Sequence, residues 1–241
     1  MKKVFILLLT IPFFSCEPLQ QAAGTYPSAT NNPEQSKIVE GLKQALTIGT
    51  QNSTNKLSAV DGFFADAAVK ILMPPEAQTV EKTLRQFGLG SLVDKTILSL
   101  NRAAEDAAQS ATPIFVDAIK QMTITDALGI LQGGDFAATN YFKGKTTAQL
   151  TAAFSPVISK SLDKVDATKY WSEMFSAYNK FSAKKVPTDL NAYVTQKAID
   201  GIFYEVGLEE QKIRKDPAAR VTDLLKQVFG GNKAKQKNNQ Q

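Results

Sequence analysis

Apolar residues recur with the period of an α-helix over most of this chain, and period-2 alternation is nearly absent. No hairpin signal lies between two strand-like runs. We therefore expect an all-α domain, bundle-like, of about eight or nine helices. Gly49 and Ser53 lie on the first apolar stripe and would let a neighbouring helix approach. That stripe comprises Ile38, Val39, Leu42, Ala45, Leu46, Gly49, Leu57 and Val60.

Capping residues and helix breakers set the expected helix boundaries. The first helix begins at Ser36 and ends at Asp61-Gly62, and Pro74-Pro75 opens a helix that runs to Phe87, with Gly88 beyond its end. Thr112-Pro113 predicts either a new helix or a kink. Thr146 and Gln149 fit a capping box. The other expected N-caps are Ser91, Thr125, Asp135, Asp166, Asp189 and Asp216.

The first sixteen residues have the pattern of an export signal. Lys2-Lys3 precede a largely apolar run, Val4 to Phe14, and Ser15-Cys16 follows. The run is too short to span a bilayer core of about 30 Å. A lone Cys at the cut resembles the signal of bacterial lipoproteins, in which that Cys is lipidated; the alternative is a plain signal peptide with a chance Cys. No acidic run follows Cys16, so we expect a lipid-anchored envelope protein, on the outer membrane and facing the periplasm.

Composition divides the chain into four parts. Residues 1–15 are the expected signal peptide and 16–36 a lipidated Cys with a flexible spacer rich in Pro, Gly, Asn, Ser and Gln. Residues 37–229 form the helical domain, and 230–241 a basic, disordered tail. The net charge is +5, but Lys2, Lys3 and the three tail lysines account for all of it. A neutral body lacks the clustered basic surface typical of nucleic-acid binding, although the tail could contact anionic lipid.

The chain contains no histidine. This excludes Ser-His-Asp and Cys-His catalysis and His-ligated zinc. Gly133-Gly134-Asp135 lacks the Gly-Lys-Ser/Thr ending and the preceding strand of a phosphate-binding loop, so it indicates a helix end and the next helix start. The sequence predicts no cofactor and no metal.

Six blocks of sequence have a distinctive order and spacing. They are Asp61–Phe64, Leu100–Glu105, Met122–Ala127, Gly133–Phe142, Tyr193–Phe203 and Ile213–Arg220. Together they resemble the bacterial lipoprotein family catalogued as domain of unknown function 4197, over about residues 37–229. The resemblance implies a secreted helical protein and brings no established activity with it.

Two glutamates fall inside the apolar stripe of the expected helix 189–215. On a helical wheel with Val194 at zero, Glu205 lies at about 20° and Glu209 at about 60°, within the apolar arc. Such a pair could act as metal ligands or as acid and base, with Arg102 or Arg214 beside it. A di-iron site would need Glu-x-x-His, which is absent. The alternative is an ion pair of either glutamate with an arginine: Arg85, Arg102, Arg214 or Arg220.

Other residues are candidates for binding. Asn101 shares an apolar row and would be a buried polar group, whereas Arg102 would form a solvated pair with Asp106. The aromatic series from Tyr170 to Phe181 could line an apolar pocket or belong to the core, and Phe63-Phe64 would plug the bundle end. Five residues of the recognised blocks are the binding candidates: Asn101, Glu105, Asp135, Tyr141 and Asp200.

These patterns favour a non-enzymatic function. The sequence predicts a membrane-tethered periplasmic lipoprotein that binds an apolar ligand or an envelope protein, with its lipid on Cys16. The alternative is a carboxylate-dependent hydrolase or metal-binding protein that uses Glu205 and Glu209. The oligomeric state stays open.

Overall fold

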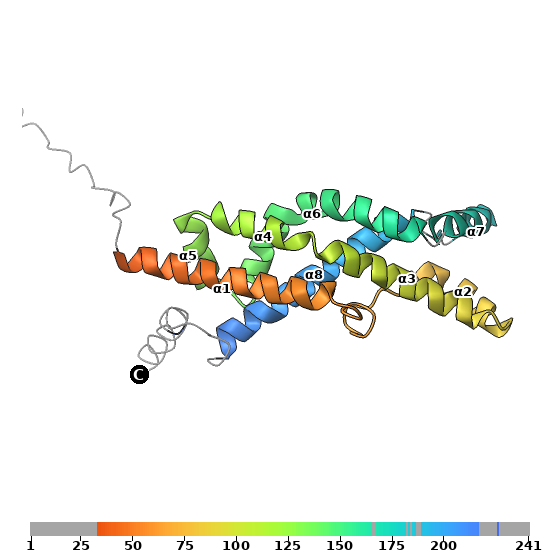
Figure 1. The fold of residues 1–241 in the computed structure, drawn as a ribbon, viewed down its shortest axis with the longest axis horizontal. Helices are drawn as coiled ribbons and strands as arrows, with labels where there is room; N and C mark the ends of the chain where they lie inside the picture. Colours follow the sequence, from red (N-terminus) through yellow and green to blue (C-terminus); the bar gives the residue numbers. More distant parts are fainter. Residues whose placement is uncertain are drawn as a thin grey trace, which may run out of the picture. The chain divides into compact units, whose positions relative to one another are not determined.

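The computed structural model describes residues 33–164, 167–181, 183, 185–186, 189–216 and 226. Every regular element of the described residues is helical (Figure 1), which confirms the all-α prediction. The expected signal, Cys16, the cap at Asp166, the body of the helix expected after Asp216 (apart from residue 226) and the tail lie outside these residues. The elements are α1 Pro33–Ser58, a 3-10 turn Pro75–Ala77, α2 Gln78–Gln86, α3 Gly90–Ala108, α4 Ala111–Lys120, α5 Ile124–Gln132, α6 Ala137–Asp163, α7 Ala167–Phe181 and α8 Leu190–Lys215.

Helix α1 begins at Pro33, three residues before the expected start, and buries its predicted stripe from Val39 to Leu57. A Cβ atom at Gly49 would lie 3.5 Å from Ile213 Cδ1 on α8, so the expected close approach at this glycine is confirmed. Val60 lies beyond the end of the helix and is 79% exposed, so its assignment to the stripe was wrong.

The core forms where α6 packs against α3 and α8, and α1 against α4 and α8. Phe115 of α4, Phe142 of α6 and Phe203 of α8 meet there edge to face, with ring centroids 5.2 and 6.1 Å from Phe115. Such aromatic pairs contribute about 0.5–1.5 kcal/mol beyond their burial. None of the described helices is long and apolar enough to cross a membrane.

Helix α6 is one continuous helix where the sequence predicted two. Thr146 is fully buried in its middle and donates to the Phe142 carbonyl, 2.7 Å away, instead of capping a new helix. A threonine hydroxyl can satisfy its own helix in this way. The apolar row at every fourth position therefore overrides the capping pattern; its members are Phe142, Leu150, Phe154, Ile158 and Leu162.

Several other predicted caps are displaced by one or two residues. Thr123, not Thr125, caps α5, because Asp126 at the third helical position completes a capping box with it. Ser110 precedes α4 where Thr112 was expected.

The predicted caps of two further helices are also displaced. Leu89 precedes α3 where Ser91 was expected, and Phe136 precedes α6 where Asp135 was expected. The boundaries at Gly88, with φ of 78°, and at Asp189, which accepts from the Ala192 N–H, are confirmed.

A non-helical segment, residues 59–74, joins α1 to the 3-10 turn; we call it the 59–74 loop. It turns at Asp61, where φ is 68°. Gly62 is needed because a Cβ atom there would lie 2.3 Å from the Lys56 carbonyl oxygen. Phe63 is fully buried, and a Cβ atom at Gly201 of α8 would lie 2.6 Å from its ring.

Candidate functional site

Among the described residues, three carboxylates are buried: Glu105 on α3, and Glu205 and Glu210 on α8. A buried carboxylate is costly unless hydrogen bonds and cations satisfy it. The partners of each group therefore decide whether it can do chemistry or holds the fold together.

Glu105 anchors the start of the 59–74 loop. Its Oε1 atom accepts from the backbone N–H groups of Phe63, at 3.1 Å, and Phe64, at 3.2 Å. Its Oε2 atom accepts from Arg102 at 2.5 Å, and Arg102 also donates to Asp61 at 2.7 Å. The hydrogen bonds that Arg102 donates, first to Glu105 and then to Asp61, raise the pKa of Arg102. The predicted pairing of Arg102 with Asp106 was therefore wrong.

Asn101 anchors the other end of the same loop. Its amide accepts from the Ile71 N–H at 2.8 Å and donates to the Ile71 carbonyl at 2.8 Å. It also donates to the Ile97 carbonyl of its own helix at 2.7 Å. Asn101 is buried as predicted, and its amide is bonded to backbone. Asn101 and Glu105, one helical turn apart, together fix both ends of the loop against α3.

Glu205 forms an ion pair with α1. Lys56 donates to it at 2.8 Å and to Asp66 of the loop at 2.9 Å. The hydrogen bond to Glu205, followed by that to Asp66, raises the pKa of Lys56, and the Lys56 hydrogen bond lowers the pKa of Asp66. The sequence predicted an arginine as the partner of Glu205. The partner is a lysine of α1, because α1 packs against α8 at this point.

Glu209 has a different environment. It accepts from Asn52 of α1 at 3.1 Å and forms an ion pair with Lys212, one turn further along α8. The sequence predicted an arginine as the partner of Glu209, and this was wrong, because the cation is a lysine. Glu205 and Glu209 thus bond to separate cations, and none of the described hydrogen bonds joins both.

Glu210 was not identified from the sequence, because the expected apolar arc ended at about 120°. Glu210 lies at about 160°, between the buried Ile199 at about 140° and the buried Phe203 at about 180°. It accepts from the backbone N–H groups of Ala138 and Thr139, each at 2.9 Å, and from the Thr139 hydroxyl at 2.8 Å. Arg214 donates to it at 2.8 and 2.9 Å and reaches the Ile130 carbonyl at 2.7 Å. A side chain of α8 therefore caps α6, which has no cap of its own.

The remaining binding candidates, Asp135, Asp200 and Tyr141, each contact a different partner and do not form one site. Asp135 is exposed and pairs with Lys215 at 2.7 Å. Asp200 is exposed and accepts from Gln196 at 2.9 Å. The Tyr141 hydroxyl lies 3.5 Å from the Ala118 carbonyl, and burial raises its pKa. Within the described chain, none of these groups shares a hydrogen-bond or ion-pair partner with the buried glutamates.

The aromatic series on α7 is only partly described. Trp171 and Phe175 are buried, with ring centroids 4.6 Å apart, as core residues would be. The side chains of Tyr170, Met174, Tyr178 and Phe181 lie outside the described part. In the described ranges, no group of three or more Cys, Asp or Glu side chains is arranged to hold a metal ion.

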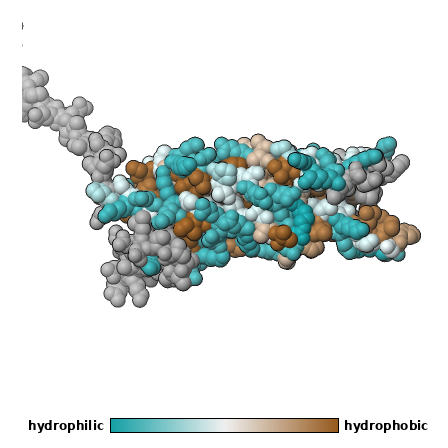
Figure 2. Space-filling model, in the orientation of Figure 1, coloured by the Kyte–Doolittle hydropathy of each residue, from teal (hydrophilic) through white to brown (hydrophobic). Residues whose placement is uncertain are grey.

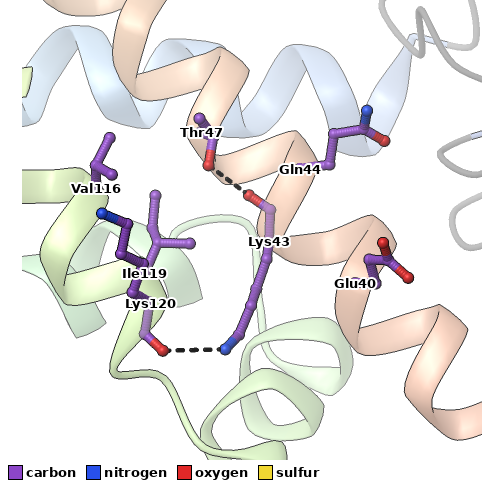
Figure 3. A pocket seen from close by; sticks show the side chains of 7 residues that line it. All are labelled: Glu40, Lys43, Gln44, Thr47, Val116, Ile119 and Lys120. Atoms are coloured by element: carbon purple, nitrogen blue, oxygen red, sulfur yellow. Dashed lines mark hydrogen bonds between the residues drawn. The ribbon is translucent and has the colours of Figure 1, made fainter.

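A groove between α1 and α4 has a volume of about 360 Å³, whereas two voids beside Glu210 hold about 10 Å³ each. Figure 3 shows the Lys43 side chain crossing it, with its ammonium 3.3 Å from the Lys120 carbonyl at the end of α4. Val116 and Ile119 supply an apolar wall. We call this the α1–α4 groove; its lining is Glu40, Lys43, Gln44, Thr47, Val116, Ile119 and Lys120.

The chain was compared with known proteins. A family model described as "Protein of unknown function (DUF4197)" matches residues 32–230. No curated protein and no solved structure matches it. The match covers the whole described helical body and agrees with the blocks of sequence noted above. The chain therefore belongs to the DUF4197 family of proteins of unknown function.

Proposed function

We propose that this protein is a lipid-anchored lipoprotein of the bacterial cell envelope that binds an apolar or amphipathic ligand in the α1–α4 groove and catalyses no reaction. The observation that carries the proposal is the groove. Its volume, about 360 Å³, falls at the lower end of the range typical of small-ligand sites, about 300–1,000 Å³.

The lining of the groove indicates the chemistry of the ligand. Val116 and Ile119 would contact an apolar chain, and the Lys43 ammonium would attract an acidic group. Lys120 pairs with Asp117 at 3.6 Å, and Glu40 also lines the groove, so Lys43 is the cation that we assign to the ligand. The Lys43 contact with the Lys120 carbonyl is long, at 3.3 Å, and exposed. Lys43 can exchange it for a charged partner at little cost.

The state of the buried carboxylates favours binding over hydrolysis. A general acid or base must reach the substrate proton. Glu205 instead bonds to Lys56, and Glu105 and Glu210 bond to backbone N–H groups and an arginine. Their bonds hold helices and a loop in place. This supports the ion-paired interpretation over a Glu205/Glu209 hydrolase or metal site.

The anchor is tested in cells by Cys16→Ser. If Cys16 carries lipid, the wild-type protein sediments with membranes and the variant remains in the soluble periplasmic fraction. If a variant that is cleaved normally still sediments with membranes after a high-salt wash, the lipid anchor is removed from the proposal.

The groove is tested by placing a photo-cross-linking amino acid at Val116 in intact cells. The matched control is Lys143, which is exposed on α6 and lies outside the groove lining. We expect a specific adduct from Val116, lost when Lys43→Glu reverses the charge beside it, and no such adduct from Lys143. Identical adducts at both positions, or none at Val116, would contradict a groove ligand.

A further inference from the structure

Three large apolar side chains surround the turn between α2 and α3 and are exposed. Phe87 is 78% exposed, Leu89 46% and Leu92 54%. Gly88, with φ of 78°, makes the turn, and nothing lies within 4 Å of the position a Cβ atom would take. Figure 2 shows hydrophobic colouring at the end of the molecule where α2 and α3 meet in Figure 1. We call residues 82–95 the α2–α3 tip.

The core does not need these side chains. No residue of α2 is buried, and only Val80 and Leu84 pack partly against the core. Phe87, Leu89 and Leu92 are not among the residues that pack against the core. Exposed clusters of large apolar side chains on soluble domains mark contacts with a partner or a membrane.

Basic residues flank the cluster. Arg85 pairs with both acidic residues nearby, Glu81 at 3.0 Å and Asp94 at 2.8 Å. Lys82 and Lys95 are exposed, and the three cations exceed the two carboxylates by one, so the net charge around the cluster is positive. Apolar side chains flanked by lysines fit the interface of an anionic bilayer. Each Lys near such a surface contributes about 1 kcal/mol to the free energy of binding.

We propose that the α2–α3 tip inserts Phe87, Leu89 and Leu92 into the surface of an anionic phospholipid bilayer. This contact rests on the proposed function, because the lipid on Cys16 would hold the body at a membrane. The sixteen residues from 17 to 32 can span at most about 55 Å, which lets the body lie against the bilayer. Two weak membrane contacts on one chain bind more firmly than either alone.

The test uses the mature chain, residues 16–241, with Cys16→Ser, so that no lipid contributes. Its co-sedimentation with vesicles of phosphatidylglycerol and phosphatidylethanolamine is compared with that on phosphatidylcholine vesicles. We expect binding to the anionic vesicles that weakens with salt. Phe87→Gln with Leu89→Gln should weaken it at least about tenfold. The matched control is Ile124→Gln, at a residue 45% exposed on α5, which should bind as the parent does.

A second measurement reports the insertion directly. In Phe87→Trp the new indole should shift its emission to the blue on anionic vesicles, whereas Tyr204→Trp, at a residue 45% exposed on α8, should not. The native Trp171 is buried and contributes equally to both. Absence of binding by the parent, or equal binding by the tip variant, would overturn the proposal.

The two proposals are separated by salt, because contact through the tip should be lost in a high-salt wash of the cell membranes, whereas a lipid on Cys16 should survive it. A protein that self-associates through the tip and ignores vesicles would instead assign this surface to a contact between copies of the chain, and would also overturn the proposal.

Discussion

At the scale of single residues, Glu210 joins three parts of the fold. It accepts from the first turn of α6 and from Arg214, and Arg214 reaches the carbonyl of Ile130 on α5. Its removal takes the acceptor from two backbone N–H groups and the paired carboxylate from a mostly buried guanidinium, which keeps its bond to the Ile130 carbonyl. Breaking a buried pair in this way costs about 3–5 kcal/mol.

Glu210→Ala is therefore expected to lower the free energy of unfolding by about 3–5 kcal/mol, measured by urea denaturation. The matched control is Glu209→Ala, one residue away, whose bonds to Asn52 and Lys212 are exposed and should be worth less than about 1 kcal/mol. Similar losses in both variants would show that Glu210 is not the specific cap of α6.

Asp66 gives a prediction that depends on pH. Its folded pKa lies below its ordinary value of 3.8, because Lys56 and the Ala68 N–H donate to its carboxylate. A lowered carboxyl pKa adds stability above the unfolded pKa, and that stability is lost as the pH falls through the folded pKa. Asp66→Asn should thus lower stability at pH 7, by up to about 1 kcal/mol.

The same difference should disappear at acid pH. Urea midpoints of the two proteins should converge as the pH falls below 3.8, where the wild-type carboxylate also gains its proton. A gap that stays constant from neutral to acid pH would mean that Asp66 stabilises the loop without its charge.

The sequence predicted some of these residues and missed others for a physical reason. Asn101 and Glu205 interrupt apolar rows, so a helical wheel identifies them as buried. Glu210 lies between the buried Ile199 and Phe203 on the wheel, so a wider apolar arc would have included it. Its role could not be predicted, because a wheel carries no information on which helix end lies nearby. The partners of Glu205 and Arg102 likewise depend on tertiary contacts between distant segments.

At the scale of the elements, two glycines of the helices face a neighbouring segment at different distances. A Cβ atom at Gly201 of α8 would lie 2.6 Å from the buried ring of Phe63, whereas at Gly49 of α1 the nearest atom lies 3.5 Å away. Gly201→Ala forces the ring or the helix to move, at a cost of about 1–3 kcal/mol. Gly49→Ala fits, and gains helix propensity of up to about 1 kcal/mol.

Thermal unfolding of both variants checks this contrast. We expect a lower melting temperature for Gly201→Ala and an unchanged or higher one for Gly49→Ala. A stable Gly201→Ala protein would show that Phe63 has room to move, and that the 59–74 loop is not held against α8 by close packing.

Helix α6 shows where element prediction from sequence stops. Its apolar row predicts the helix, and Thr146 with Gln149 predicts a break within it, because a capping box and a mid-helix threonine use the same residues. Burial decides between them, since Thr146 lies in the row that faces the core. The apolar stripes in the sequence therefore predicted the helices well, whereas the capping residues predicted the helix ends less well.

At the scale of the whole molecule, the helical class and the family follow from patterns spread along the chain. An error in the position of one helix end does not change either prediction. The assembly of the site does not follow from them, because it depends on the 59–74 loop, which has no regular pattern. This loop is fixed to α3 by Glu105 at one end and by Asn101 at the other. If each side chain holds its own end, the two ends should open independently.

Hydrogen exchange at single amides distinguishes independent ends from one cooperative loop. Glu105→Ala removes the acceptor of the Phe63 and Phe64 N–H groups and should raise their exchange rates, while that of Ile71 changes little. Asn101→Ala should do the reverse. If both variants raise all three rates equally, the loop opens as one unit, and only the combined bonds of α3 stabilise it. Independent opening would instead mean that the Asp61 end, beside Arg102, can move while the Ile71 end stays packed against the helical body.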